Sequence, residues 1–283
     1  MKVENTTVVY SAEPSLRHPV RLVSGLIHDL ARAKELIWSI FLRDLRAQFR
    51  QSILGYFWLL LPPVATAAVW LLLQSQKVLR VETEIPYPLF ILIGTTIWIS
   101  FVNFVNAPLL GFNSGKSVYS KLNVSPEAFV ISSILRAVLN TLVRVTILIP
   151  VFIWFKFTPP ATAFLFPIAA FFFFSIGIAI GILCIPFGSL FTDIGNFLRN
   201  FIRLLMYICP VIYPIRKAGW FGELMQKNPF TPGVAWCRDL ITTGEMTWAL
   251  PTIVIGSIGL LLSFVAFVFL RVARPHLIAR LGM

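Results

Sequence analysis

Long apolar runs are the feature that most constrains how this chain can fold. A bilayer core about 30 Å thick requires roughly 20 apolar residues in a helix. Five runs approach that length, at residues 53–73, 88–112, 128–155, 161–187 and 248–270, and a sixth at 194–213 carries Arg199 and Arg203 near its start. Hydrophobic residues make up 57% of the chain and charged residues 13%, which excludes an ordinary soluble domain. We therefore predict an all-α integral membrane protein with six transmembrane helices.

The basic residues predict the orientation of these spans. Six spans put both termini on one side, and assigning that side to the cytoplasm places 15 Lys and Arg residues inside and 7 outside. Because cytoplasmic loops carry an excess of Lys and Arg, we expect both termini in the cytoplasm. The net charge of +12 then fits anionic lipid rather than nucleic acid. No soluble segment carries the basic stripe interleaved with aromatic residues that nucleic-acid binding would need.

Three regions follow from this count: a cytoplasmic arm at 1–52, a six-span transmembrane domain at 53–271 and a cytoplasmic tail at 272–283. The arm does not begin like a cleaved secretory signal, so the first span is expected to direct insertion. Within the arm, residues 21–50 alternate apolar and charged positions at helical spacing. This pattern predicts an amphipathic helix on the inner membrane surface, with Arg43, Arg46 and Arg50 near anionic lipid.

The segment at 214–247 lies between the last two spans and is expected outside. Two weakly amphipathic pieces, 220–227 and 233–242, flank the dipeptide at 228–229 and predict short re-entrant helices. Aromatic rings prefer the membrane interface. The external gate candidates are therefore Tyr213, Trp220, Phe230 and Trp236. The cysteines at 184, 209 and 237 form no CxxC pair, so neither a zinc site nor a disulfide framework is indicated.

The stretch GFNSGKS, residues 111–117, ends in the Gly-Lys-Ser of a phosphate-binding loop. A complete loop reads G-x-x-x-x-G-K-[ST] and follows a strand. Here Leu110 occupies the position of the first glycine, and the preceding run is long enough to span a membrane. We therefore expect no ATP site in this chain. Residues 113–126 are instead predicted to form a cytoplasmic loop whose short helix docks on a partner, because Val118 and Leu122 share one helical face.

Five stretches in order along the chain carry a resemblance to a known family: RDLRAQFRQSILGYFWLLLPP (43–63), SVYSKLNVSPEAF (117–129), FTDIGNFLR (191–199), CPVIYPI (209–215) and NPFTPGVAWCRDLI (228–241). With the topology above, they resemble the membrane permease subunit of type-2 ABC exporters that carry O-antigen and similar cell-surface polysaccharides. The resemblance extends from about residue 36 to residue 271. Thr192 stands where this family commonly has arginine, and Cys209 where it commonly has threonine.

The resemblance implies a transport subunit of the bacterial inner membrane without catalytic residues, metal or cofactor of its own. Two copies of the chain would form a homodimer around a channel for a lipid-linked polysaccharide. Two copies of a separate ABC ATPase subunit would dock below and hold ATP and Mg²⁺. The coupling segment would fit a cleft of that ATPase together with the interfacial helix, through Lys116, Ser117, Val118, Tyr119, Lys121 and Leu122.

Polar residues within the spans are channel candidates. Arg136, Asn140 and Arg144 are spaced by four and share one face of the third span, and Asn103 and Asn106 lie in the second. Charge within hydrocarbon is costly and faces a cavity, a partner or an interface. Channel lining and structural pairing therefore both remain open, with Asp193 a possible partner for Arg136.

Other functions are compatible with the same composition. Drug or lipid export would use the same kind of permease, and a passive channel would carry flux without ATP. An integral membrane enzyme acting on lipid-linked sugar would need carboxylates or a metal at the membrane surface. The expected external acids show no repeated motif: Glu82, Glu84, Glu223, Asp239 and Glu245.

Overall fold

A computed structural model describes the chain at residues 25, 28, 30–50, 52–76, 83–119, 124–215 and 219–281. Every regular element in these ranges is a helix. In chain order they are α2 (Lys34–Phe49), α3 (Phe57–Ser75), α4 (Tyr87–Ser114), α5 (Lys116–Tyr119), α6 (Pro126–Val145), α7 (Leu148–Trp154), η2 (Ala161–Leu165), α8 (Phe166–Leu183), α9 (Ile185–Gly188), α10 (Thr192–Leu204), η3 (Leu205–Tyr207), α11 (Trp220–Lys227), α12 (Thr231–Thr242) and α13 (Ala249–Leu281).

Five helical stretches in the described part of the chain are long and apolar enough to cross a membrane: Phe57–Ser75, Tyr87–Tyr119, Pro126–Trp154, Ala161–Leu183 and Ala249–Ala273. They correspond to five of the predicted spans. The prediction of six such helices is not confirmed, because the run at 194–213 contains only the 13-residue α10 and the 3-residue η3. The chain leaves helical geometry after Tyr207, since Pro210 has no N–H to continue the ladder.

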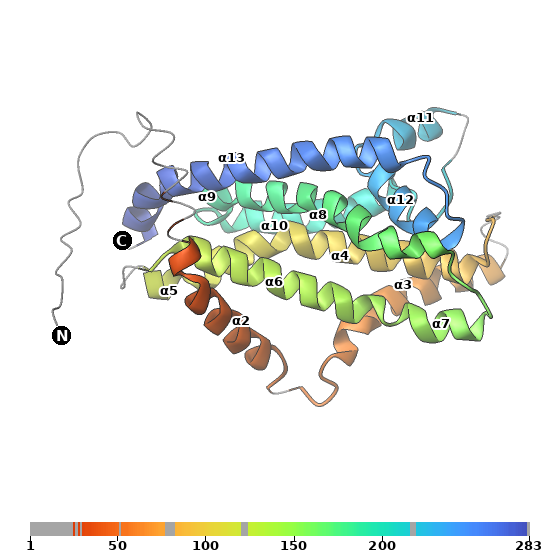
Figure 1. Ribbon diagram of the computed structural model, residues 1–283, viewed down its shortest axis with the longest axis horizontal. Coiled ribbons are helices and arrows are strands. Elements are labelled where there is room, and N and C mark those ends of the chain that lie inside the picture. The colour runs from red at the N-terminus through yellow and green to blue at the C-terminus, as the bar shows by residue number, and fades with distance from the viewer. Residues whose placement is uncertain are drawn as a thin grey trace.

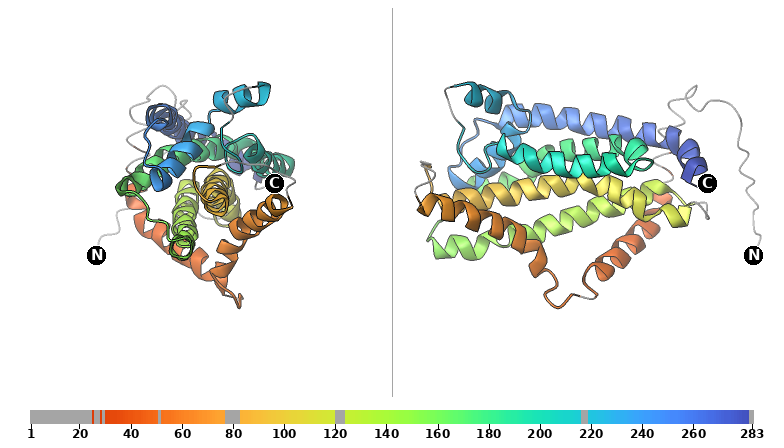
Figure 2. Two further views of the ribbon diagram at one scale, coloured as in Figure 1. Left: turned by 90° about the vertical axis from the view of Figure 1, so that its right-hand side faces the viewer. Right: turned by 180° about the vertical axis from the view of Figure 1, so that it is seen from behind.

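The helices form an elongated bundle around α4 (Figure 1). Of the residues in the apolar stretch of α4, 83% are buried, whereas in α3 only 11% are buried. Seen along the bundle, α4 lies between α3, α6 and α8, and it also contacts α10 (Figure 2). The long α13 packs along α8. Because a central apolar helix must be contacted on all sides, α4 carries much of the core, including Trp98, Phe101 and Phe104.

The two ends of the bundle differ. The end that we call the α5 end holds α5, α9, the start of α2 and the C-terminal part of α13 (Figure 1). The opposite α12 end holds α7, α11 and α12. Helices α8 and α13 both run towards the α5 end, so the chain has to return along the bundle after α8 and before α13. Helix α10, η3 and the turn after them make this return, with α10 packed beside α4 (Figure 2).

Helix α2 packs part of its apolar surface against the protein, while Leu36 and Trp38 remain exposed. Ile37, Ile40 and Phe41 are buried in a second cluster that includes Phe112 and Phe129. From there α2 leans away from the bundle towards its C-terminal end (Figure 1). Its basic residues Arg43, Arg46 and Arg50 are exposed.

Candidate functional site

Helix α5, the predicted coupling helix, is bonded to the bundle by two of its side chains. Lys116 Nζ donates a hydrogen bond to the backbone oxygen of Ser189 at 2.6 Å, and Tyr119 Oη donates to the backbone oxygen of Phe112 at 3.0 Å. Glycine is required at position 115, since a Cβ there would lie 2.6 Å from Cγ of Phe129.

These bonds decide which predicted coupling residues can meet a partner. Lys116 and Tyr119 point into the protein, Val118 is half-buried and Ser117 is exposed. Lys121 and Leu122 lie outside the described residues. The Lys116–Ser189 bond links α5 to the connection between α9 and α10, so a force applied to α5 has a direct path to α10.

Arg144 is buried in the bundle and joins three helices. Its Nε donates to the backbone oxygen of Leu59 in α3 at 3.2 Å, and its NH1 donates to Ser100 Oγ in α4 at 3.1 Å. In the amide orientation that satisfies both partners, Asn103 Oδ1 accepts from NH1 at 3.1 Å and from NH2 at 2.8 Å. Arg144 therefore serves structural pairing.

The choice of Leu59 as acceptor has a backbone reason. In an α-helix the carbonyl of residue 59 accepts from the N–H of residue 63. Residue 63 is a proline within α3, which has no N–H. Arg144 thus supplies the donor that Pro63 removes, and a buried carbonyl without a donor would be costly.

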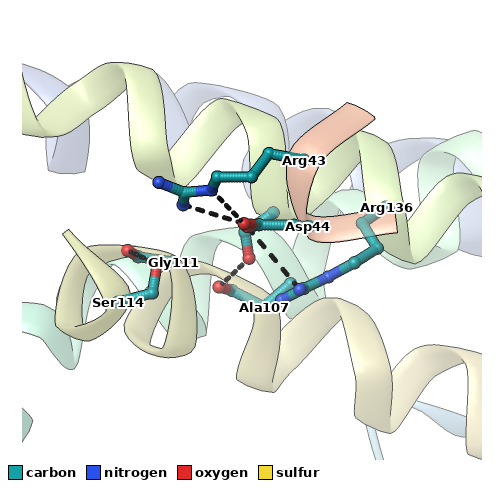
Figure 3. Close-up of polar contacts among 7 residues, drawn as sticks. Arg43, Asp44, Ala107, Gly111, Ser114 and Arg136 are labelled. Atoms are coloured by element: carbon teal, nitrogen blue, oxygen red, sulfur yellow. Dashed lines mark hydrogen bonds and ion pairs between the residues drawn. The ribbon is translucent and has the colours of Figure 1, made fainter. Parts of the chain in front are cut away.

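Arg136 pairs with α2 and not with the expected Asp193. Its NH1 lies 3.7 Å from Asp44 Oδ2, while Asp44 Oδ1 accepts from Arg43 Nε and NH2 at 3.0 and 2.8 Å. Figure 3 shows Asp44 between these two arginines. Asp193 is exposed in the first turn of α10.

Four of the five channel candidates line one cavity. Asn103, Asn106, Arg136 and Asn140 surround a space of about 230 Å³ between α2, α4 and α6. Gln48 of α2 and Ser133 of α6 complete its polar lining. The structure therefore gathers these residues, while Arg144 lies beside them with its bonds already made.

The predicted external gate is only partly where the sequence placed it. Trp220 is 78% exposed on α11, and Tyr213 packs against Phe221. Trp236, in contrast, is buried in the core, and Phe230 packs against Trp98 and Phe101 of α4. Trp236 is thus covered by protein because α12 packs against α4 and α8, and Phe230 is half-buried.

Sequence reasoning missed Arg238, which α12 buries in the bundle. Its NH1 donates to the backbone oxygen of Pro210 at 2.6 Å, and its guanidinium lies 4.0 Å from the ring centre of Phe90. Burial lowers the pKa of Arg238 to about 10 and raises the pKa of the adjacent Asp239 to about 6. A buried arginine on a short helix fixes α12 to α4 and to the turn after η3.

The same region contains a cavity of about 600 Å³ at the α12 end. Three of the five acids that appeared scattered in the sequence, Glu84, Asp239 and Glu245, line it together with Trp248. In the described part of the chain, no group of three His, Cys, Asp or Glu residues could hold a metal ion.

The second feature missed from the sequence is an exposed polar stripe on α10. Residues Asn196, Arg199, Asn200 and Arg203 are exposed and lie on one helical face, since they are spaced three or four apart. A separate face of the same helix exposes Phe197, Phe201 and Leu204. The third face, with Leu198 and Ile202, is buried in the core. Helix α10 thus presents both an apolar and a polar surface outward.

The comparisons with known proteins agree with this architecture. The model of the ABC-2 type transporter family matches residues 35–242. The chain is 22% identical over 191 residues to the O-antigen export system permease protein RfbA of Myxococcus xanthus, covering 67% of this chain and 72% of that protein. It is 23% identical over 235 residues to a Klebsiella pneumoniae protein of the same name, covering 78% and 85%. It is 24% identical over 221 residues to the polysialic acid transport protein KpsM of Escherichia coli, covering 76% and 84%.

Five apolar helices of spanning length define a multi-pass membrane protein. The family match covers most of the chain, so the chain belongs to the ABC-2 type transporter family. It is a transmembrane permease of a type-2 ABC exporter.

Proposed function

We propose that this permease exports lipid-linked O-antigen or a similar polysaccharide across the bacterial inner membrane. The names of its relatives support a glycan, since two are O-antigen export permeases and one is a polysialic acid transport protein. Drug or lipid export is the alternative within the same architecture. The chain is a transport subunit, and ATP with Mg²⁺ would be bound by a separate ABC ATPase.

The observation that carries the transport pathway is the exposed polar stripe of α10. Polar side chains at membrane depth face water or a protein partner, because hydrocarbon offers them no hydrogen bonds. Asn196, Arg199, Asn200 and Arg203 meet that condition if a second copy of the chain faces α10 across a hydrated path. The homodimer would thereby enclose the channel.

In this arrangement α10, η3 and the turn to Tyr213 are the sixth membrane crossing. Helices α8 and α13 run in the same direction, so the chain must cross back after α8 and before α13, which supports this assignment (Figure 2). Six crossings put both termini on one side, and the basic residues favour the cytoplasm. The α5 end would then face the cytoplasm, where two ATPase copies dock on α5 and α2, and α11 and α12 would lie at the outer side.

Affinity purification of the tagged chain in mild detergent tests the partner. We expect a stoichiometric soluble protein with a complete G-x-x-x-x-G-K-[ST] loop, and loss of surface polysaccharide when the chain is deleted. A chain that purifies alone while surface polysaccharide stays normal would refute the proposal. Export that persists without ATP would indicate a passive channel. Loss of turnover on replacing Glu84, Asp239 and Glu245, with ATPase binding intact, would instead favour an enzyme.

Cysteine labelling tests the pathway. Asn200→Cys should react with a membrane-impermeant maleimide from the aqueous phase, whereas Phe201→Cys, one residue on, should react slowly. The native Cys209 and Cys237 are fully buried and give little background, and Cys184 is replaced by serine in both variants. Equal labelling at positions 200 and 201 would contradict a hydrated path along α10.

A further inference from the structure

The cavity between α2, α4 and α6 has features of a binding site that channel lining does not explain. Its polar side chains come from three helices: Gln48, Asn103, Asn106, Ser133, Arg136 and Asn140. It lies between Gln48 of α2, residues 103–110 of α4 and residues 133–140 of α6. We call this cavity the Arg136 niche.

Arg136 is an incompletely satisfied cation in this niche. Its side chain is 25% exposed, and its ionic partner among the described residues, Asp44, lies at 3.7 Å, beyond hydrogen-bond distance. Asp44 already accepts two hydrogen bonds from Arg43 (Figure 3). A guanidinium carries five N–H donors and no acceptor. Arg136 therefore has donors left for a ligand.

The amides around Arg136 add to this excess of donors. Asn103 uses its oxygen for Arg144, so its amide belongs to the Arg144 junction. Asn106 donates to the backbone oxygen of Val102 at 2.7 Å, which fixes its orientation. Asn140 has a buried Oδ1 without a hydrogen-bond partner in the described part of the chain. No hydrogen bond in the described part of the chain involves its Nδ2 either, so Asn140 offers N–H donors beside those of Arg136, while its Oδ1 itself needs a donor.

The walls beside the niche are apolar. Leu110 lines the cavity and is 43% exposed, and Ala107 and Ala137 complete its apolar part. Such a surface within a spanning helix faces hydrocarbon. A ligand that combines an anionic oxygen group with an apolar tail would therefore satisfy both parts of the site.

We propose that the Arg136 niche binds the phosphate group of a membrane lipid, with Arg136 as the anion ligand, the amides as further donors and Leu110 beside the tail. Arginine is suited to this role because its planar fork pairs with two phosphate oxygens. The lipid is either an ordinary anionic phospholipid or the lipid that carries the glycan, and the second case rests on the proposed export function. Binding itself requires neither ATP nor export.

Native mass spectrometry of the full-length chain, purified in mild detergent with its copurifying subunits, tests this site. The probes are dioleoyl phosphatidylglycerol, a polyprenyl phosphate and dioleoylglycerol, which has the tails without the phosphate. We expect both phosphate lipids to be retained and dioleoylglycerol to be lost. If the polyprenyl phosphate is retained more strongly than phosphatidylglycerol, the ligand is the glycan carrier. If the two are retained equally, the ligand is an ordinary phospholipid. Both outcomes support a phosphate site.

Variants separate this site from general attraction to a basic protein. Arg136→Gln should weaken retention by about tenfold or more, because charge-assisted hydrogen bonds are lost. Asn140→Leu should also weaken it, since leucine fills the cavity while the Arg136–Asp44 pair remains. Lys227→Gln, at an exposed cation of α11, should bind like the unmodified chain.

Folding is checked by size exclusion and the thermal midpoint. If Arg136→Gln does not fold, Asn140→Leu decides the question, because an apolar residue is tolerated in a spanning helix. Retention of dioleoylglycerol equal to that of the phosphate lipids would overturn the proposal. So would retention of phosphate lipids unchanged in a folded Asn140→Leu or Arg136→Gln protein. Failure here would leave the ATPase and polysaccharide tests of the export function unaffected.

Discussion

Replacing Arg144 by leucine should destabilise the bundle by breaking the junction of α3, α4 and α6. Arg144→Leu removes the bonds to the Leu59 carbonyl, to Ser100 and to Asn103. Leucine is close in size and apolar, so the loss comes from hydrogen bonding rather than from packing. In the unmodified protein this arginine is only 3% exposed, which leaves little water to replace its bonds.

The size of the effect follows from the partners that are left behind. A buried polar group without a partner costs about 1–3 kcal/mol. Ser100 and Asn103 can turn towards other partners, but the Leu59 carbonyl cannot, because Pro63 has no N–H to offer it. We therefore expect a loss of about 3 kcal/mol, which corresponds to a fall in Tm of about 6–12 °C.

A second substitution isolates the backbone part of this loss. Pro63→Ala restores the N–H that the Leu59 carbonyl would use in a regular helix. It should therefore stabilise the Arg144→Leu protein more than the unmodified protein, by about 1 kcal/mol. Pro62→Ala is the matched control, since it restores a donor to the carbonyl of residue 58, which Arg144 does not contact.

Thermal unfolding of the six proteins in one detergent measures the coupling: position 144 as Arg or Leu, each with α3 unmodified, Pro62→Ala or Pro63→Ala. Size exclusion and tryptophan fluorescence follow the unfolding. Equal benefit from Pro62→Ala and Pro63→Ala in the Arg144→Leu background would refute the reasoning. A Tm for Arg144→Leu within about 2 °C of the unmodified protein would refute it as well, because roughly 1 kcal/mol or less would then be lost.

Three further predictions concern other contacts. Lys116→Met should leave ATPase binding intact but lower export per ATP hydrolysed several-fold, because α5 loses its bond to Ser189. Lys116→Arg keeps a donor and part of the coupling. Equal export per ATP hydrolysed by the two variants and the unmodified protein in a reconstituted assay would contradict this. Gly94→Ala should lower the free energy of unfolding by about 1–3 kcal/mol, since its Cβ would lie 2.4 Å from the backbone oxygen of Val211. Gly195→Ala should change Tm little, because its Cβ would meet only a side-chain methyl at 3.3 Å. Because burial raises the pKa of Asp239 to about 6, the folded state holds its proton more tightly than the unfolded state does, so Tm should fall as pH rises from about 4 through 6. Asp239→Asn should remove that part of the pH dependence.

Sequence patterns predicted the helical class, the family and five of the spans, because these depend on local composition. A run of about 20 apolar residues can hardly avoid a membrane helix, whatever its neighbours do. The helical spacing of apolar and charged residues at 21–50 predicted an amphipathic helix, and the structure forms α2 within that range. The broken Gly-Lys-Ser motif was likewise recognised from local spacing, and the structure places its lysine against Ser189.

Contacts between residues far apart in the chain could not be predicted from local sequence. The partner of Arg136 is Asp44 on α2, which lies 92 positions earlier in the chain, and nothing in the spacing distinguishes it from Asp193. The burial of Trp236 depends on α12 packing against α4 and α8, whereas its sequence is equally typical of an interface. The sixth run was expected to span with Arg199 and Arg203 near its start, but only the packed structure shows that its polar residues are exposed as one stripe while Leu198 and Ile202 are buried.

The sequence alone therefore determined that this chain is a helical membrane protein, since hydrophobicity acts through each segment separately, and its resemblance to the exporter family indicated a permease. Tertiary structure decided which polar side chains are satisfied within the bundle and which are left for a ligand or a partner. Arg144 belongs to the first group because Pro63 leaves it a carbonyl to bind, and Arg136 to the second because Asp44 lies beyond hydrogen-bond distance. Hydrogen bonding has short range, so this division exists only after the helices have packed.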